Sequence, residues 1–475
     1  MPILIVLLLT ASAAKVEWFA PPAGLSPPAT LALTAAMTLA PVLLTGVLAR
    51  WCAAALRRGQ AARAGVAARY VRLRRRFGVL NVVALIVVVP FGWGDTVWHA
   101  VTFADGTLVP FAELLVPAPY LLAVFASWLL HFDAERELHR TGIDDFRPFW
   151  TRASHFGFNL RPFALLVLLP LVLFAAQQSF VRFFPEAAGA PLTQVLALLA
   201  VPVMFALLPL AVKPALGLKS LPIGPTRTRL EALAARLKFR CRDLLLWPTH
   251  GGVANAMVVG IFAPARYVVF TDKLLESLEP EELDAVFGHE VGHVKHGHIP
   301  YYALFFVLSA TATAGAVDAA AKAAVEVGYL SSQVWDGWVT LPPLAVMGGY
   351  IFLVFGFISR KCERQADVFG SRAAGIPAMV RALERVAYLN GMDSTTPARN
   401  PRGRLRGMRG LLRSWQHGTI GERIRFLLRL AENPSLESSF QWRVFALKCG
   451  LLAALAAAIG LLIWRVGWSE LVRTL

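Results

Sequence analysis

The apolar residues of this chain fall in long blocks rather than in the narrow stripes of amphipathic helices. A membrane-spanning helix needs about 20 consecutive, mostly apolar residues. Prolines interrupt several blocks, but neighbouring helices can satisfy the freed backbone groups, so these prolines do not exclude spans. The pattern predicts a mostly α-helical, polytopic integral membrane protein with about seven or eight transmembrane helices. The predicted spans are 29–49, 78–94, 112–130, 162–180, 192–212, 300–324, 340–358 and 443–464.

The first fourteen residues, MPILIVLLLTASAA, are also apolar and end in small side chains. They lack the basic segment that begins a secretory signal peptide. We interpret them as a membrane-associated N-terminal segment. A weak signal peptide and an extra short span are the alternatives.

Composition agrees with a membrane protein. The chain has 475 residues, of which 56% are hydrophobic and only 16% charged, whereas soluble domains are about 25% charged. The net charge of +17 suits either nucleic acid or an anionic membrane face, and its concentration between apolar blocks favours the membrane. The four cysteines form no CxxC pair, which gives no sign of a disulfide framework or a cysteine-based zinc site.

Charge alternates between successive polar segments. Segment 50–77 contains nine arginines and no acid, whereas segment 95–111 contains two aspartates and neither lysine nor arginine. The positive-inside rule assigns the basic segments to the cytoplasm. A histidine-rich stretch and an acidic stretch, separated by two predicted spans, then lie on the same side and can meet. The segments assigned to the cytoplasm are 50–77, 131–161, 213–299 and 359–442.

The largest polar insert, 213–299, has the pattern of a small α+β domain. TRTRLEALAARLKF predicts an amphipathic helix, and RDLLLWPT, AMVVGIFA and RYVVFT predict short strands separated by Gly- and Pro-bearing turns. EPEELDAVFGHEVGHVKHGH predicts a further helix, with Ser277 as its expected N-cap and Pro280 in its first turn. We therefore expect a small α+β domain at the cytoplasmic face.

The stretch DAVFGHEVGHVKHGH, residues 284–298, contains four of the ten histidines. His289 and His293 are four residues apart and share one face of a helix, where two neutral imidazoles can hold one Zn²⁺. Glu290 follows the first of them and can take a proton from the attacking water. This HExxH pattern predicts a zinc hydrolase helix, and with it a zincin-like α+β catalytic domain at the cytoplasmic face. A histidine-rich surface helix is the alternative.

A catalytic zinc needs a third protein ligand. The metzincin continuation HExxHxxGxxH is out of register here, and an intramembrane HExxH protease is disfavoured because the motif follows a charged amphipathic run. His296 and His298 are either further ligands or, as we favour, polar residues at the helix end. The better source is SRKCERQADVFG, where Glu363 and Asp367 are four residues apart and the small Ala366 lets another helix approach. A membrane-edge helix with snorkelling charges is the alternative.

HEVGH, followed some seventy residues later by ERQAD beyond intervening spans, resembles peptidase family M48. These membrane zinc proteases include the heat-shock protease HtpX and the CaaX prenyl protease, and the resemblance covers roughly 220–430. It implies that His289, His293 and Glu363 bind one zinc per chain and that Glu290 is the catalytic acid and base. It also implies that Asp367 orients a ligand imidazole.

Two shorter stretches are similar to elements of the same family. ANAMVVG resembles its cleft-edge strand and implies that Asn255, Ala256 and Met257 bind an extended peptide substrate by strand addition; Met257 replaces the usual aromatic residue. HGTIGERI resembles an HPPxxxRI element, with Gly418 and Thr419 in place of both prolines. His417 is then expected to donate to the oxyanion of the reaction, or else to play a structural role.

We therefore predict a membrane-embedded zinc metalloendopeptidase that acts on membrane-associated or damaged membrane proteins at the cytoplasmic face. The Ala-, Arg- and Leu-rich composition favours a bacterial inner membrane. CaaX-type processing of lipidated proteins and a non-catalytic zinc-binding membrane protein remain alternatives. The arginine-rich stretch 399–415 is expected to face anionic lipid rather than nucleic acid. Oligomeric state, natural substrate and an enclosed chamber stay open.

These assignments divide the chain into five segments. An N-terminal transmembrane bundle is followed by the catalytic insert, two further spans, a cytoplasmic segment with the third ligand, and a C-terminal apolar helix. The corresponding ranges are 1–212, 213–299, 300–358, 359–442 and 443–475.

Overall fold

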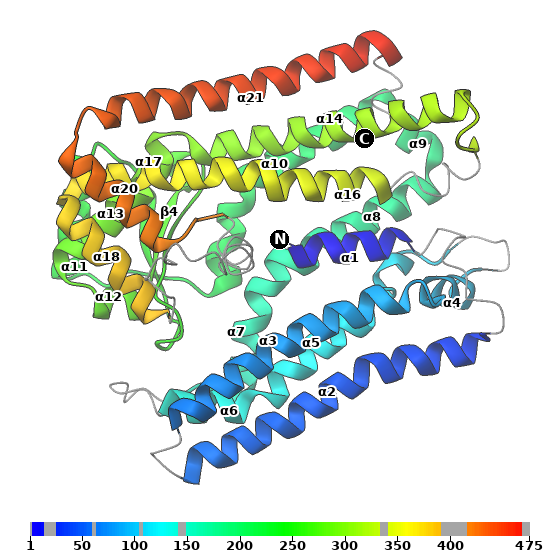
Figure 1. The fold of residues 1–475 in the computed structure, drawn as a ribbon, viewed down its shortest axis with the longest axis horizontal. Coiled ribbons are helices and arrows are strands. Elements are labelled where there is room, and N and C mark those ends of the chain that lie inside the picture. The colour runs from blue at the N-terminus through cyan, green and yellow to red at the C-terminus, as the bar shows by residue number, and fades with distance from the viewer. Residues whose placement is uncertain are drawn as a thin grey trace, which may run out of the picture. The chain divides into compact units, whose positions relative to one another are not determined.

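The computed structural model describes residues 2–13, 25–58, 63–103, 108–140, 149–332, 341–390 and 416–467. It is mostly helical with one small mixed sheet, as the sequence predicts, and it divides into two compact units (Figure 1). The first unit comprises residues 1–193 and 316–348, and the second comprises 194–315 and 349–475. The arginine-rich stretch 399–415 lies outside the described residues.

In the described residues the first unit consists mainly of helices. In it α2 packs against α3, α5 and α6, and α8 packs against η3 and η2. The elements are α1 (Pro2–Ala13), α2 (Pro27–Arg58), α3 (Arg63–Val88), α4 (Trp93–Ala100), η2 (Ala112–Leu114), α5 (Ala118–Leu130), α6 (Phe132–Arg140), α7 (Arg152–Phe163), the π-helical turn η3 (Ala164–Leu168), α8 (Leu169–Phe183) and α9 (Pro185–Gly189).

The N-terminal apolar stretch forms the helix α1. Its 12 residues are fewer than the roughly 20 that a full span requires. Leu7 and Ala11 are buried in a cluster with Leu85, Tyr120 and Leu171. The helix is therefore anchored by apolar packing within the first unit.

Five helices in the described part of the chain are long and apolar enough to cross a membrane, or six if the bent pair Gly65–Val88 and Trp93–Ala100 counts as one span. Several extend well past the predicted apolar blocks. Because α2 ends at Arg58 and α3 begins at Arg63, most of segment 50–77 is helical rather than a loop. Arginine is a good helix former whose stem lies along apolar surface, so hydropathy marks only the apolar part of such a helix.

The second unit contains a four-stranded sheet with the order β1-β2-β4-β3. β2 and β4 are parallel, whereas the outer pairs are antiparallel. All three strands predicted for the polar insert are present, and only the two-residue β1 was not predicted. The central strand β4 is buried along its whole length, and β3 forms an edge. The bounds are β1 (Lys219–Ser220), β2 (Asp243–Trp247), β3 (Ala256–Val259) and β4 (Tyr267–Thr271).

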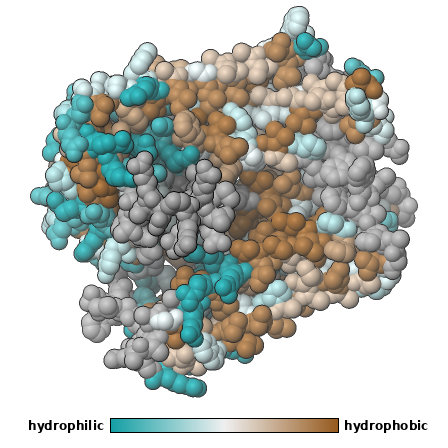
Figure 2. Space-filling model, in the orientation of Figure 1, coloured by the Kyte–Doolittle hydropathy of each residue, from teal (hydrophilic) through white to brown (hydrophobic). Residues whose placement is uncertain are grey.

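Helices cover this sheet and extend away from it. Figure 2 shows hydrophilic side chains gathered over the end of the unit that holds α11, α12 and α13, and mostly hydrophobic ones along α21. The elements are α10 (Pro191–Leu216), α11 (Pro225–Arg236), η4 (Ala263–Ala265), α12 (Asp272–Ser277), α13 (Pro280–Lys295), α14 (His298–Glu326), α16 (Leu341–Tyr350), the π-helical turn η5 (Ile351–Phe355), α17 (Gly356–Ala374), α18 (Ile376–Leu389), α20 (Ile420–Glu432) and α21 (Leu436–Val466); α10, α14 and α16 each cross a boundary between the units.

The motif helix α13 begins and ends differently from the prediction. Ser277 is the last residue of α12, and the N-cap is Glu279, whose side chain forms a capping box with Glu282. A carboxylate serves as well there because it accepts the free amides of the first turn. Gly297 adopts a φ of 63°, a left-handed conformation that ends the helix. The predicted single helix through His298 is therefore two helices.

Helices α13 and α17 cross at very short range because small residues face each other. A side chain on Gly292 would place its Cβ 3.0 Å from the Cα of Ala366, and one on Gly288 would place it 2.7 Å from the Cβ of Ala373. The predicted close approach at Ala366 is confirmed. The HExxH helix and the acidic helix are thus held backbone to backbone.

Candidate metal centre

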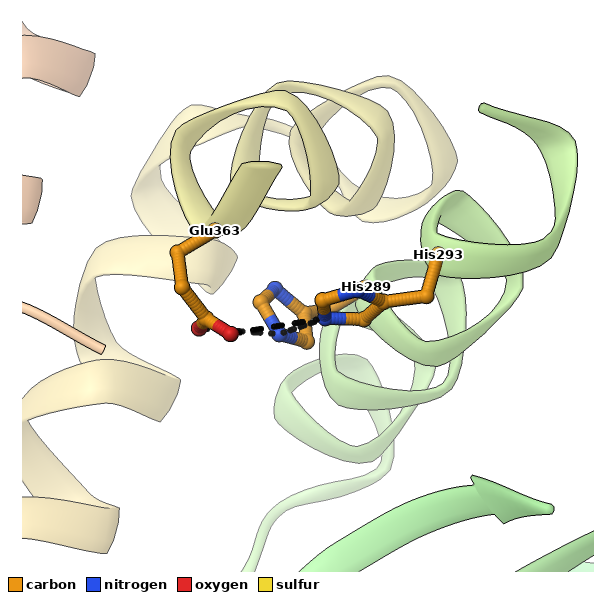
Figure 3. Close-up of side chains that lie close together, drawn as sticks. All are labelled: His289, His293 and Glu363. Atoms are coloured by element: carbon orange, nitrogen blue, oxygen red, sulfur yellow. Dashed lines mark hydrogen bonds and ion pairs between the residues drawn. The ribbon is translucent and has the colours of Figure 1, made fainter. Parts of the chain in front are cut away.

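Three side chains from the two crossing helices converge on one point (Figure 3). His289 and His293 project from α13, and Glu363 projects from α17. One donor atom from each lies within 4.8 Å of the other two. Within the described part of the chain, no other group of three or more His, Cys, Asp or Glu residues meets this criterion.

The spacing of these donors suits a tetrahedral metal. The two Nε2 atoms are 3.2 Å apart, and each lies 3.7 Å from an oxygen of Glu363. Zinc with bonds of about 2.0–2.1 Å in a tetrahedron sets neighbouring ligand atoms about 3.3 Å apart. Two imidazoles and one carboxylate are also the donor set of many catalytic zinc sites, which keep a fourth position open. The residues present therefore fit such an ion.

Asp367 and Arg423 stand behind the donors. Oδ1 of Asp367 lies 2.9 Å from Nδ1 of His289, on the side of the ring away from the metal position. The buried Arg423 donates from Nε to Asp367 at 2.7 Å and lies 3.3 Å from Glu363 through Nη1. Burial lowers the pKa of Arg423, but the charge of Asp367 outweighs it and the net pKa is raised. One fixed positive charge thus holds both carboxylates.

The two ring ligands have opposite electrostatic surroundings. Burial lowers the pKa of His289, but the contact with Asp367 raises it by more, so that its pKa lies above the ordinary value. Burial lowers the pKa of His293 to about 4. In the protein alone, therefore, His293 is neutral at pH 7, the form in which an imidazole binds metal.

Glu290 lies next to the donors in sequence and faces the sheet edge. Its Oε2 accepts a hydrogen bond of 2.9 Å from the backbone N–H of Val258 in β3. Burial raises the pKa of its carboxyl, and the nearby His289 partly offsets this. A carboxylate with a raised pKa is a better proton acceptor at neutral pH. The arrangement sets a carboxylate suited to accepting a proton between the three donors and an edge strand.

The residues expected to bind substrate lie on or beside β3. The backbone carbonyl of Asn255 accepts from Thr271, so in the alternating antiparallel pattern Asn255 and Met257 direct their backbone groups toward β4. The backbone groups of Ala256 and Val258 then face the free edge. The sequence predicted the strand but not the contact of Val258 with Glu290. Only the pairing register shows which backbone groups of the strand face outward.

His417 contacts the third donor. Its Nδ1 lies 2.9 Å from Oε1 of Glu363, while 68% of its side chain is exposed. The hydrogen bond and the charge of Glu363 raise the pKa of His417. Gly418 has a φ of 73°, which proline, locked near −65°, cannot adopt. The backbone here therefore differs from an element with a proline after the histidine.

The remaining histidines of the cluster are not among the three donors. His296 is the C-cap of α13. His298 is fully buried, with Nδ1 2.9 Å from Nδ1 of His293 and Nε2 3.1 Å from Oε1 of Gln365. The sequence did not reveal this contact, because it depends on the turn at Gly297. It also gave Arg423 no role, since its partners lie about sixty residues earlier in the chain.

Part of the chain is similar to a known peptidase family and to curated proteases. Residues 227–429 match the model of peptidase family M48. The chain is 29% identical over 216 residues to Protease HtpX of Ectopseudomonas mendocina (strain ymp), covering 42% of this chain and 71% of the relative. It is also 29% identical over 212 residues to Protease HtpX of Pseudomonas putida (strain W619), covering 42% and 69%.

The fold resembles a solved structure over most of its length. The crystal structure of S. mikatae Ste24p aligns with a TM-score of 0.50 at 16% sequence identity. The alignment covers 83% of this chain and 98% of that one. It therefore includes apolar helices that lie outside the family match.

Proposed function

We propose that this chain, an integral membrane metallopeptidase that belongs to peptidase family M48, is a zinc endopeptidase with one Zn²⁺ per chain. The observation that carries the proposal is the convergence of His289, His293 and Glu363 within 4.8 Å. The adjacent Glu290 adds a base that faces the edge of a strand. A metal and a base beside a strand edge suit metal-assisted hydrolysis of an extended peptide.

When bound, zinc would lower the pKa of a coordinated water to about 7 and polarise the scissile carbonyl. Glu290 takes the proton of the attacking water and later gives it to the leaving amine. Asp367 holds the ring of His289 from behind, and Arg423 holds Asp367. The close crossing of α13 and α17 keeps the two halves of the ligand set together.

An extended substrate would add to the sheet as a further strand along β3. The outward-facing backbone groups of Ala256 and the carbonyl of Val258 would supply hydrogen bonds that do not depend on substrate sequence. Because Val258 also donates to Glu290, a chain on this edge runs past the base. Asn255 and Met257 would contribute through their side chains.

His417 would act at the mouth of the site. Its large exposed fraction and its contact with Glu363 support a side chain that can reach a bound substrate while remaining next to the third ligand. In the reaction it would donate to the oxyanion that forms from the substrate carbonyl.

The substrates would be membrane-associated or damaged membrane polypeptides. The similarity to Protease HtpX of two pseudomonads supports a bacterial protease, and the long apolar helices support a membrane setting. The alternation of basic and non-basic segments supports an active site on the cytoplasmic side. A substrate at this site would come from, or lie close to, the lipid bilayer.

The test is cleavage of an unfolded model protein by the detergent-purified chain, with and without a zinc chelator. Glu290→Gln should retain zinc and lose about 10²- to 10⁴-fold in rate, the range attributed to a general base. Glu384→Gln, on the exposed face of α18, is the matched control and should remain active.

Equal activity in Glu290→Gln and the unaltered chain would overturn the assignment of the base. Cleavage confined to a lipid-modified C-terminal peptide would favour the CaaX-type alternative. Stoichiometric zinc without cleavage of any peptide tested would favour a non-catalytic zinc-binding protein.

A further inference from the structure

The outer nitrogen of His293 has an unusual partner. A metal-binding histidine commonly donates its second ring N–H to a carboxylate, a backbone carbonyl or water. His289 follows this rule, with Asp367 2.9 Å from its Nδ1. Nδ1 of His293 instead lies 2.9 Å from the ring nitrogen of another histidine, His298. One of these two nitrogens must donate and the other accept.

Metal binding decides the direction. A neutral imidazole carries one proton, so His293 can offer the lone pair of Nε2 to a metal only if its proton is on Nδ1. His293 then donates to Nδ1 of His298. His298 in turn carries its proton on Nε2, which lies 3.1 Å from the carbonyl oxygen of Gln365 and donates to it. If His298 donated to His293 instead, Nε2 of His298 would carry no proton. Two acceptors, this nitrogen and the carbonyl oxygen of Gln365, would then face each other.

The chain of hydrogen bonds continues into the last helix. The side-chain amide of Gln365 donates to Oε1 of Gln441 at 2.6 Å, and Gln441 lies on α21. A second polar side chain of the same helix, Lys448, donates to the backbone carbonyl of His296 at 2.9 Å. Through Gln441 and Lys448, α21 thus makes two polar contacts close to the C-terminal end of the motif helix.

The geometry is tightly held. His298 is fully buried, Gln365 is nearly so, and the ring of His298 packs against the rings of His293 and His296. Both ring nitrogens of His298 and both polar atoms of the Gln365 side chain have partners in this chain, and such a buried polar network holds its members in one arrangement. His298 itself lies at the first residue of α14, next to the turn at Gly297.

We propose that His298 is a positioning residue for the metal centre. With Gln365 and Gln441 it holds the proton of His293 on Nδ1 and keeps Nε2 directed at the metal. The C-terminal helix α21 is then a structural part of the zinc site through Gln441. This inference rests on the proposed function, since it requires that His289, His293 and Glu363 bind zinc.

The test measures zinc affinity by competition with a chromophoric chelator, which requires no enzymatic activity. His298→Leu removes the acceptor and should lower zinc affinity about 10- to 100-fold, the effect typical of outer partners of a ligand. His298→Asn supplies an amide oxygen close to the position of Nδ1 and should restore most of the affinity. His99→Leu, on an exposed histidine, is the matched control and should leave the affinity unchanged.

Gln441→Leu extends the test to α21. It should lower zinc affinity by less than His298→Leu does, because Gln441 acts through two intermediate side chains. Gln177→Leu, an exposed residue on α8, is its control. If His298→Leu fails to fold, His298→Asn and Gln441→Leu still decide the matter, since a positioning chain requires near-normal affinity in the first and reduced affinity in the second.

Three outcomes are separable. If the unaltered chain binds one zinc and His298→Leu binds it equally well, the positioning role is wrong and the proposed function stands. If both His298 variants lose affinity to the same extent, the residue acts through packing and not through its acceptor, which also overturns the proposal. If the unaltered chain binds no zinc, the proposed function itself fails. It also fails if His289→Ala binds zinc as tightly as the unaltered chain does.

Discussion

The protein buries two clusters of histidine and carboxylate side chains, one in each compact unit. In the first unit, His131 lies 3.1 Å from Thr45 through Nε2 and 3.1 Å from the hydroxyl of Tyr70 through Nδ1. Tyr70 donates to one oxygen of Glu135 at 3.0 Å, and His155 lies 2.7 Å from the other. Every ring nitrogen of His131 and each oxygen of Glu135 therefore faces a protein group.

In the second unit the same residue types are arranged differently. The outer nitrogens of His289 and His293 face protein partners, and His417 and Arg423 contact Glu363. The two Nε2 atoms and the carboxylate of Glu363 nevertheless all converge on one place. Neighbouring lone pairs repel unless a cation or a proton lies between them. The comparison shows that a functional site is distinguished by the convergence of acceptors, and not by the number of histidines and acids that are buried.

The largest expected effect separates the two clusters by removing one carboxylate from each. Glu363→Gln removes an anionic ligand and should lower zinc affinity by more than loss of an outer partner does, by about 100-fold or more, with activity lost in parallel. Glu135→Gln should leave zinc content unchanged and lower the unfolding temperature instead, because the ion pair with Arg74 and the hydrogen bonds of the cluster are weakened. The expected decrease in the free energy of unfolding of Glu135→Gln is about 1–3 kcal/mol.

Bound zinc is measured by elemental analysis of each purified variant, and stability by the unfolding temperature in detergent. Loss of zinc from Glu135→Gln at full thermal stability would contradict the distinction between the two clusters. So would full zinc occupancy in Glu363→Gln.

Much of the second site could be predicted from the chain alone. His289 and His293 are linked by helical spacing, and Glu363 by its place after two spans on the same predicted side of the membrane. His298 could not be predicted, because its direction depends on one left-handed glycine at 297. The cluster of the first unit could not be predicted either, since only His131 and Glu135 are linked by helical spacing, and its other members, from Thr45 to His155, meet them only through helix packing.

An intermediate effect is expected where α13 and α17 cross. Gly292→Ala would place a Cβ 2.9 Å from the Cβ of Phe369 and 3.0 Å from the Cα of Ala366. The helices must separate, which costs about 1–3 kcal/mol and moves Glu363 away from both imidazoles. We expect zinc affinity to fall about tenfold, equivalent to about 1.4 kcal/mol, measured by chelator competition.

Gly157→Ala is the control for this change, because a Cβ at that helical glycine meets nothing within 4 Å. It should leave zinc affinity unchanged and slightly favour its helix. If Gly292→Ala bound zinc as tightly as Gly157→Ala, the short interhelical distance would not be what brings the ligands together.

The smallest expected effect concerns the loop that presents His417. Gly418→Ala forces an L side chain into a φ of 73°, at a cost of about 1–2 kcal/mol, and should displace His417 from Glu363. Because Arg423 still contacts Glu363 through Nη1, the zinc affinity should fall by less than the roughly 10- to 100-fold expected for loss of His298, whereas kcat/KM should fall several-fold, up to about tenfold for 1.4 kcal/mol. Gly328→Ala carries the same strain at a φ of 76° with nothing within 4 Å, and it should leave kcat/KM unchanged. Equal losses of kcat/KM in the two variants would mean that backbone strain alone is responsible. A large fall in zinc affinity in Gly418→Ala would instead mean that His417 helps to hold the metal and does not act on the substrate.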